Sequence, residues 1–76
     1  MKETIISILQ NLVDGVDFET ATTLIDDGEL SSLDIIQLIG ALSDEFDVTI
    51  PATEIIPSNF NSVDAMVAMI ERLQED

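Results

Sequence analysis

Apolar residues recur every three or four positions in three stretches of this chain, and that spacing is typical of amphipathic helices. The pattern predicts a first helix that ends at Asp14-Gly15, a second over about 32–46 and a third over about 63–73. The three stripes are Ile5, Ile8, Leu9, Leu12 and Val13; Ile35, Leu38, Ile39, Leu42 and Phe46; and Val63, Met66, Val67, Ile70 and Leu73.

The segments between these helices are short of regular structure but rich in apolar anchors. About seventeen residues separate the first two helices, and they include Val16, Phe18, Leu24, Ile25 and Leu30, which we expect to pack along a bundle. Residues 48–50 look extended but are too few to build a sheet, and residues 53–56 can form one helical turn. A proline at position 57 is expected to stop that turn.

Together these patterns predict an all-α fold in a single domain over 1–76, with three main helices and one short helix. Asn61 or Ser62 is expected to cap the last helix, because both side chains can accept a hydrogen bond from a free backbone N–H.

Charge and apolar content are both high. The 76 residues contain two Lys or Arg against sixteen Asp or Glu, a formal net charge of −14, yet 46 % of them are apolar. Disorder requires low hydrophobicity together with high net charge. We therefore expect a folded, monomeric domain whose carboxylates repel one another, so that salt or divalent cations stabilise it.

The chain lacks the residue types that several classes of function require. The chain has no His and no Cys, so it offers no imidazole base, thiolate nucleophile, disulfide or soft metal site, and we expect no catalytic residue and no metal. Two basic residues are too few to bind nucleic acid, and no calcium-binding loop occurs. No apolar run approaches the roughly 20 residues of a membrane span. We expect a cytoplasmic protein that does not insert into membranes.

Two serines stand at the predicted start of the second helix. Ser31 is a good N-cap, and Asp34, three residues later, completes the pattern of a capping box. Ser32 is then the first residue of the helix, and its hydroxyl has no structural task. It is the candidate functional hydroxyl of this chain.

The second helix also carries two large apolar residues away from its core stripe. Leu33 and Ile36 share a face with acidic and polar residues, where a helix with one core stripe should be polar. They form either a docking patch or a surface that the long loop covers. Gly40 in this helix costs about 1 kcal/mol relative to Ala, and it permits close approach by a partner or by another helix.

The run LIDDGELSSLD over 24–34 resembles the attachment site of the acyl carrier protein family, and the similarity extends over nearly the whole chain. The resemblance implies a four-helix bundle with a long first loop and a 4′-phosphopantetheine arm, donated by coenzyme A, on Ser32. The family has Asp-Ser-Leu at this point, whereas here Ser31 replaces the Asp that is implied in contacts with the modifying transferase and its magnesium ion. Gln37 and Ser43 also stand where fatty-acid carriers tend to have Glu, and Gly40 replaces a typically bulky, partner-facing residue.

The resemblance implies a carrier of acyl or aminoacyl thioesters, serving enzymes of fatty-acid, polyketide or related biosynthesis. Because the chain has no thiol, a tethered arm would supply one. The segment 56–63 is more similar to standalone carriers of aminoacyl or specialised acyl groups than to the housekeeping fatty-acid carrier. An aminoacyl carrier of D-alanyl or peptidyl type is therefore an alternative to a fatty-acid carrier. Two other interpretations stay open: an unmodified adaptor or regulatory subunit, which the Ser31 exchange motivates, and an acidic decoy for a basic surface.

Partners of such a carrier would be a phosphopantetheinyl transferase and acyl- or aminoacyl-transferring enzymes with basic docking patches. Opposite charge speeds encounter more than it raises affinity, which suits a protein that must leave each enzyme. The expected docking residues are Leu33, Asp34, Ile36, Gln37, Gly40, Asp44 and Glu45.

Overall fold

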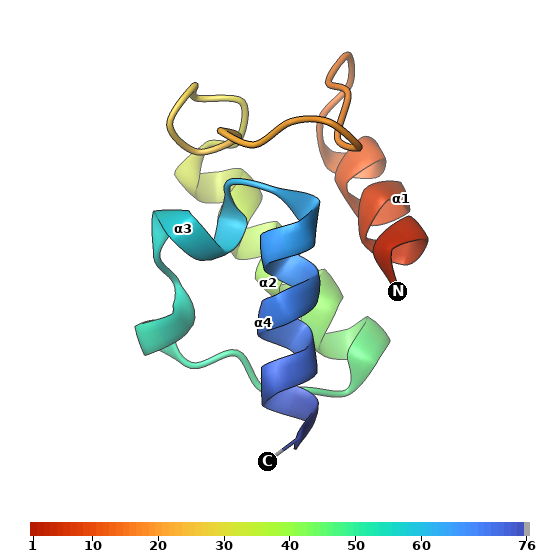
Figure 1. Ribbon diagram of the computed structural model, residues 1–76, viewed down its shortest axis with the longest axis vertical. Coiled ribbons are helices and arrows are strands. Elements are labelled where there is room, and N and C mark those ends of the chain that lie inside the picture. The colour runs from red at the N-terminus through yellow and green to blue at the C-terminus, as the bar shows by residue number, and fades with distance from the viewer. Residues whose placement is uncertain (76) are drawn as a thin grey trace.

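The computed structural model describes residues 1–75 and shows an all-helical arrangement (Figure 1). Four α-helices are present: α1 (Lys2–Leu12), α2 (Ser32–Phe46), α3 (Pro57–Phe60) and α4 (Val63–Glu75). A single 3₁₀ turn, η1 (Ala52–Glu54), precedes α3, and no strand occurs within 1–75. The predicted fold class, three main helices and one short one, is confirmed.

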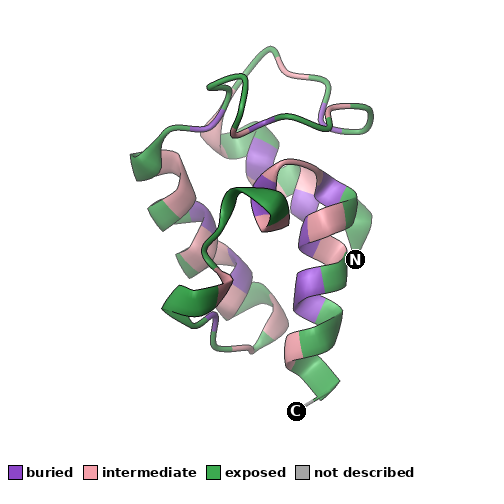
Figure 2. Ribbon diagram, turned by 60° about the vertical axis from the view of Figure 1, so that its left-hand side comes forward, coloured by how far each residue is buried: buried purple, intermediate pink, exposed green. Residues whose placement is uncertain are grey.

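One apolar core joins these elements. Helix α1 packs against both α2 and α4, and the short α3 packs against α4. The buried faces of the helices meet in the interior (Figure 2), and no polar or charged residue within 1–75 is buried there. The buried residues are Ile5, Leu9, Phe18, Leu24, Leu30, Leu38, Leu42, Ile50, Phe60, Val63, Met66, Met69 and Ile70.

The long loop between α1 and α2 packs on the bundle as predicted. Phe18, Leu24 and Leu30 are buried, and Val16 and Ile25 pack against the core. The loop is fastened at one point by Asn61, whose carbonyl oxygen accepts the N–H of Leu24 at 2.9 Å. Burial and this tether explain how a segment without helix or strand keeps a defined path.

The prediction around Pro57 was wrong. The expected turn over 53–56 is instead η1 over 52–54, and Pro57 begins a helix rather than ending one. Pro suits the first position of a helix, because its missing N–H would have no intrahelical acceptor there and its φ is already helical. The restriction on the residue before a proline does hold, since Ile56 is extended, with φ −128° and ψ 151°.

The predicted end of the first helix was also slightly wrong. Helix α1 ends at Leu12, and its C-cap Val13 is extended, with φ −138° and ψ 127°. Gly15 has φ +81° and therefore serves a turn in the loop rather than the helix end. At α4, Ser62 is the capping residue: its Oγ accepts the N–H of Ala65 at 3.0 Å.

None of the helices within 1–75 combines the length and the apolar character that crossing a membrane requires.

Candidate functional site

The start of α2 is held by the capping box that the sequence predicts. The Ser31 Oγ accepts the N–H of Asp34 at 3.2 Å, and the Asp34 carboxylate accepts the N–H of Ser31 at 3.1 Å. The first helical bond runs from the N–H of Ile35 to the Ser31 carbonyl at 3.0 Å. These contacts set the direction in which the following residue projects from the helix.

That residue, Ser32, is exposed at the first position of α2. The capping box and the first helical bond use the N–H groups of Ser31, Asp34 and Ile35, and within residues 1–75 those of Ser32 and Leu33 meet no protein acceptor. Free N–H groups and the positive end of the helix dipole favour an anion by about 0.3–1 kcal/mol. A phosphate ester on the Ser32 hydroxyl would thus be placed where the backbone stabilises it.

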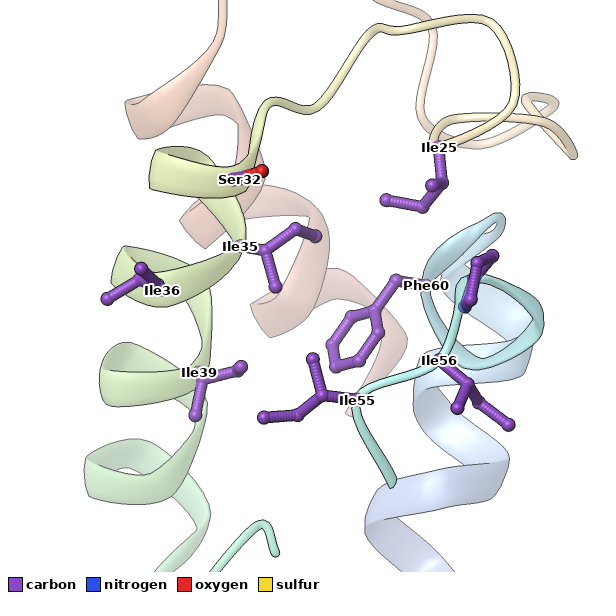
Figure 3. A pocket seen from close by; sticks show the side chains of 9 residues that line it. Ile25, Ser32, Ile35, Ile36, Ile39, Ile55, Ile56 and Phe60 are labelled. Carbon is purple, nitrogen blue, oxygen red and sulfur yellow. The ribbon is translucent and has the colours of Figure 1, made fainter. Parts of the chain in front are cut away.

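An apolar cleft of about 320 Å³ lies beside Ser32. Figure 3 shows the Ser32 hydroxyl directed to the same side of α2 as Ile35 and Ile39, and the segment from Ile55 to Phe60 faces them across the cleft. Ser32 is the one hydroxyl-bearing residue among those that line it. The lining residues are Ile25, Ser32, Ile35, Ile36, Ile39, Ile55, Ile56, Pro57 and Phe60.

Exposed aliphatic side chains lie on both sides of this cleft. Leu33 and Ile36 on α2 are 62 % and 66 % exposed, so the idea that the long loop covers them is wrong. Ile55 and Ile56, on the opposite side, are 42 % and 46 % exposed. Sequence reasoning missed this second pair, although two adjacent isoleucines before a proline, outside any helical stripe, were a signal that they need not enter the core.

The other docking residues predicted on α2 lie at its surface. Gln37, Gly40, Asp44 and Glu45 are exposed, whereas Asp34 is half-buried and already engaged in the capping box. A Cβ added at Gly40 would meet nothing within 4 Å. Close approach by another helix of this chain therefore does not explain the glycine.

Within residues 1–75, no cationic side chain forms an ion pair with the carboxylates around Ser32. Both cationic side chains are engaged elsewhere, Lys2 with Asp64 and Arg72 with Glu54, each at 3.1 Å. The acidic residues of the preceding loop, Asp26, Asp27 and Glu29, are exposed. Of these, Asp26 accepts a hydrogen bond from Asn61 and Asp27 accepts one from Thr23, neither of which carries charge. The acids oppose the anion preference of the helix end and favour a cationic partner.

Comparison with known proteins gives one consistent answer. The model of the family described as "Phosphopantetheine attachment site" matches residues 2–70. The chain is 41 % identical over 64 residues to aminoacyl carrier protein 2 of Bradyrhizobium diazoefficiens, which covers 84 % of this chain and 71 % of that protein. It is 38 % identical over 63 residues to aminoacyl carrier protein 1 of the same organism, and this match covers 83 % of this chain and 69 % of that protein.

A phosphopantetheine arm fits the residues that the structure brings together. An arm of this kind needs an exposed hydroxyl, and the start of α2 offers one beside free N–H groups and an apolar cleft. When bound, the arm supplies the thiol that this chain lacks, so that a carboxylic acid can be held as a thioester. The chain belongs to the acyl carrier protein family and is a carrier protein with a covalently attached 4′-phosphopantetheine group.

Proposed function

We propose that the Ser32 Oγ is the attachment point of the arm. The observation that carries this proposal is the position of Ser32: it is exposed, it is the first residue of α2, and its hydroxyl faces the apolar cleft. The neighbouring hydroxyl of Ser31 is occupied by the capping box. The resemblance of the run 24–34 to the family's attachment site also favours Ser32, which is followed by Leu33 as in the family's Asp-Ser-Leu motif.

We further propose that the cargo is an aminoacyl group. The two relatives named above are both called aminoacyl carrier proteins, and the resemblance over 56–63 favours the same class over the fatty-acid carrier. In this role the chain contributes no catalytic group. It presents the thioester, and partner enzymes load the cargo and transfer it onward.

Docking of those enzymes is proposed at the α2 side of the cleft. Leu33 and Ile36 supply an exposed apolar centre, and Asp44 and Glu45 add negative charge on the same helix. A partner with an apolar contact and a rim of Lys and Arg matches this surface. Contacts of this kind speed encounter without making the complex long-lived, as a shuttle between enzymes requires.

The attachment point is tested by mass spectrometry. The purified protein is incubated with coenzyme A and a phosphopantetheinyl transferase of broad specificity, and we expect a mass increase of one phosphopantetheine. Ser32→Ala should abolish the increase, while Ser31→Asp, which keeps the cap at the neighbouring position, should retain it. An increase of the same size in Ser32→Ala would place the arm elsewhere and overturn the proposal.

The cargo is tested on protein purified from its own host. Intact mass spectrometry before and after treatment with neutral hydroxylamine, which cleaves thioesters, gives the mass of the released acyl group. We expect the mass of an amino acid residue. A long-chain fatty acyl mass would overturn the aminoacyl assignment while leaving the attachment at Ser32 in place.

A further inference from the structure

One wall of the cleft beside Ser32 is a short turn with Ile55 at its centre. Ile55 has φ −84° and ψ 73°, and the N–H of Ile56 donates to the Glu54 carbonyl at 2.9 Å. These values are those of an inverse γ-turn, which fixes only one residue and buries little surface. Ile55 and Ile56 are both more than two-fifths exposed, so core packing alone does not hold the wall in place.

Hydrogen bonds and an ion pair among three polar side chains hold this turn in place. The Nδ2 of Asn59 donates to the Glu54 carbonyl at 2.7 Å and to the Glu54 Oε1 at 3.1 Å. The Nη2 of Arg72 lies 3.1 Å from the same Oε1 and donates to the Asn59 Oδ1 at 3.4 Å. Glu54, Asn59 and Arg72 come from η1, α3 and α4, so three separate elements are joined across the turn.

We propose that Arg72 is a positioning residue for the cleft. It holds Glu54 and Asn59 together from α4, and these two residues hold the Ile55–Ile56 turn opposite α2. Removing the guanidinium should loosen this wall locally while the bundle stays folded. The inference concerns the cleft itself and stands whether or not Ser32 carries the arm.

The other cation of the chain provides a matched control. Lys2 and Asp64 also form a 3.1 Å ion pair, but their side chains are 44 % and 79 % exposed and touch no part of the cleft. In the other pair the Arg72 and Glu54 side chains are 55 % and 23 % exposed, so the Glu54 carboxylate is less screened by solvent than the Asp64 carboxylate. Arg72→Gln and Lys2→Gln remove the same charge and break one ion pair each, and they differ in whether the cleft wall is involved.

Amide hydrogen exchange distinguishes a local from a global effect, because it measures opening residue by residue. The reporters are the N–H groups of Ile56 and Asn59, which donate within the turn to the carbonyls of Glu54 and Ile56. The reference is the N–H of Leu24, which donates to the Asn61 carbonyl at 2.9 Å and takes no part in the network of Glu54, Asn59 and Arg72. In Arg72→Gln we expect the two reporters to exchange about tenfold faster than in the wild type, with Leu24 little changed, as expected when a charged hydrogen-bond partner is lost.

Two further variants complete the test. Arg72→Lys, which restores a cation near Glu54, should recover at least half of the lost protection. Asn59→Ala should reproduce the loss of protection through a substitution that lies outside α4. Lys2→Gln should leave the ratio between the exchange rates of the two reporter amides and that of the Leu24 amide unchanged. The proposal is overturned if Arg72→Gln accelerates all three amides equally, or if its effect on the reporters is no larger than that of Lys2→Gln.

Discussion

The Oδ1 atom of Asn61 accepts a hydrogen bond of 2.9 Å from the backbone N–H of Ile25, thirty-six residues earlier in the chain. The same oxygen accepts the N–H of Asp26 at 3.1 Å, and the Asn61 Nδ2 donates back to the Asp26 carboxylate at 3.3 Å. One side chain between α3 and α4 therefore holds the loop that leads to Ser32. Because Ile25 lines the cleft, the hydrogen bond from its N–H to Asn61 also fixes the position of one cleft-lining residue.

Asn61→Ala should lower the free energy of unfolding by about 1–3 kcal/mol, because two loop N–H groups lose their acceptor while one of them is partly buried. Urea unfolding followed by circular dichroism measures the change. Asn11→Ala is the matched control: Asn11 is exposed on α1 and should give a change close to zero or slightly favourable. Equal effects of the two substitutions would show that the side-chain hydrogen bonds of Asn61 contribute nothing to stability.

Exchanges at Ser31 separate capping from modification. Ser31→Ala removes the capping oxygen and should destabilise the protein by about 0.5–2 kcal/mol, whereas Ser31→Asp keeps a capping acceptor and should stay close to the wild type. Because Asp is the family residue before the attachment serine, Ser31→Asp should also raise the rate of modification by the transferase. Thermal unfolding and the time course of mass increase give the two readouts. A slower reaction in Ser31→Asp would mean that the missing carboxylate does not limit modification.

Gly40→Ala should stabilise the protein by about 1 kcal/mol, because Gly40 is inside α2 and a Cβ there meets nothing within 4 Å. Urea unfolding measures the gain. If a partner's backbone approaches this glycine, the same variant should be loaded more slowly by that partner despite its higher stability. A loss of stability in Gly40→Ala would contradict the open surroundings of this position.

Charge on α2 should control encounter with partners. The double change Asp44→Asn and Glu45→Gln removes two negative charges from the proposed docking surface, and Glu71→Gln with Glu75→Gln removes two from α4. We expect the first pair to lower the rate of modification at low salt by about three- to tenfold and the second to change it much less. The difference should shrink at about 0.5 M salt, where charges are screened over a few ångströms. Equal effects of both pairs would point to net charge rather than a docking surface.

Much of the fold and part of the site follow from local sequence patterns. The span of α2, its apolar stripe and the capping box between Ser31 and Asp34 depend on residues within a turn of one another, so spacing alone predicts them. The exposed hydroxyl at position 32 follows for the same reason. Whether Leu33 and Ile36 are covered did not follow, because that depends on where a distant loop packs.

The remaining features depend on how distant segments pack against one another. Pro57 has the same chemistry whether it ends one turn or begins the next, and the packing of α3 against α4 selects the second. Met69 is buried although it stood outside the predicted stripe, because α4 contacts neighbours on more than one side. The cleft and the network of Glu54, Asn59 and Arg72 join residues from separate elements, and a periodic pattern describes only one element at a time. Local spacing is enough to locate the three long helices and the exposed hydroxyl of Ser32, whereas the cleft that this hydroxyl faces exists only because distant segments pack together.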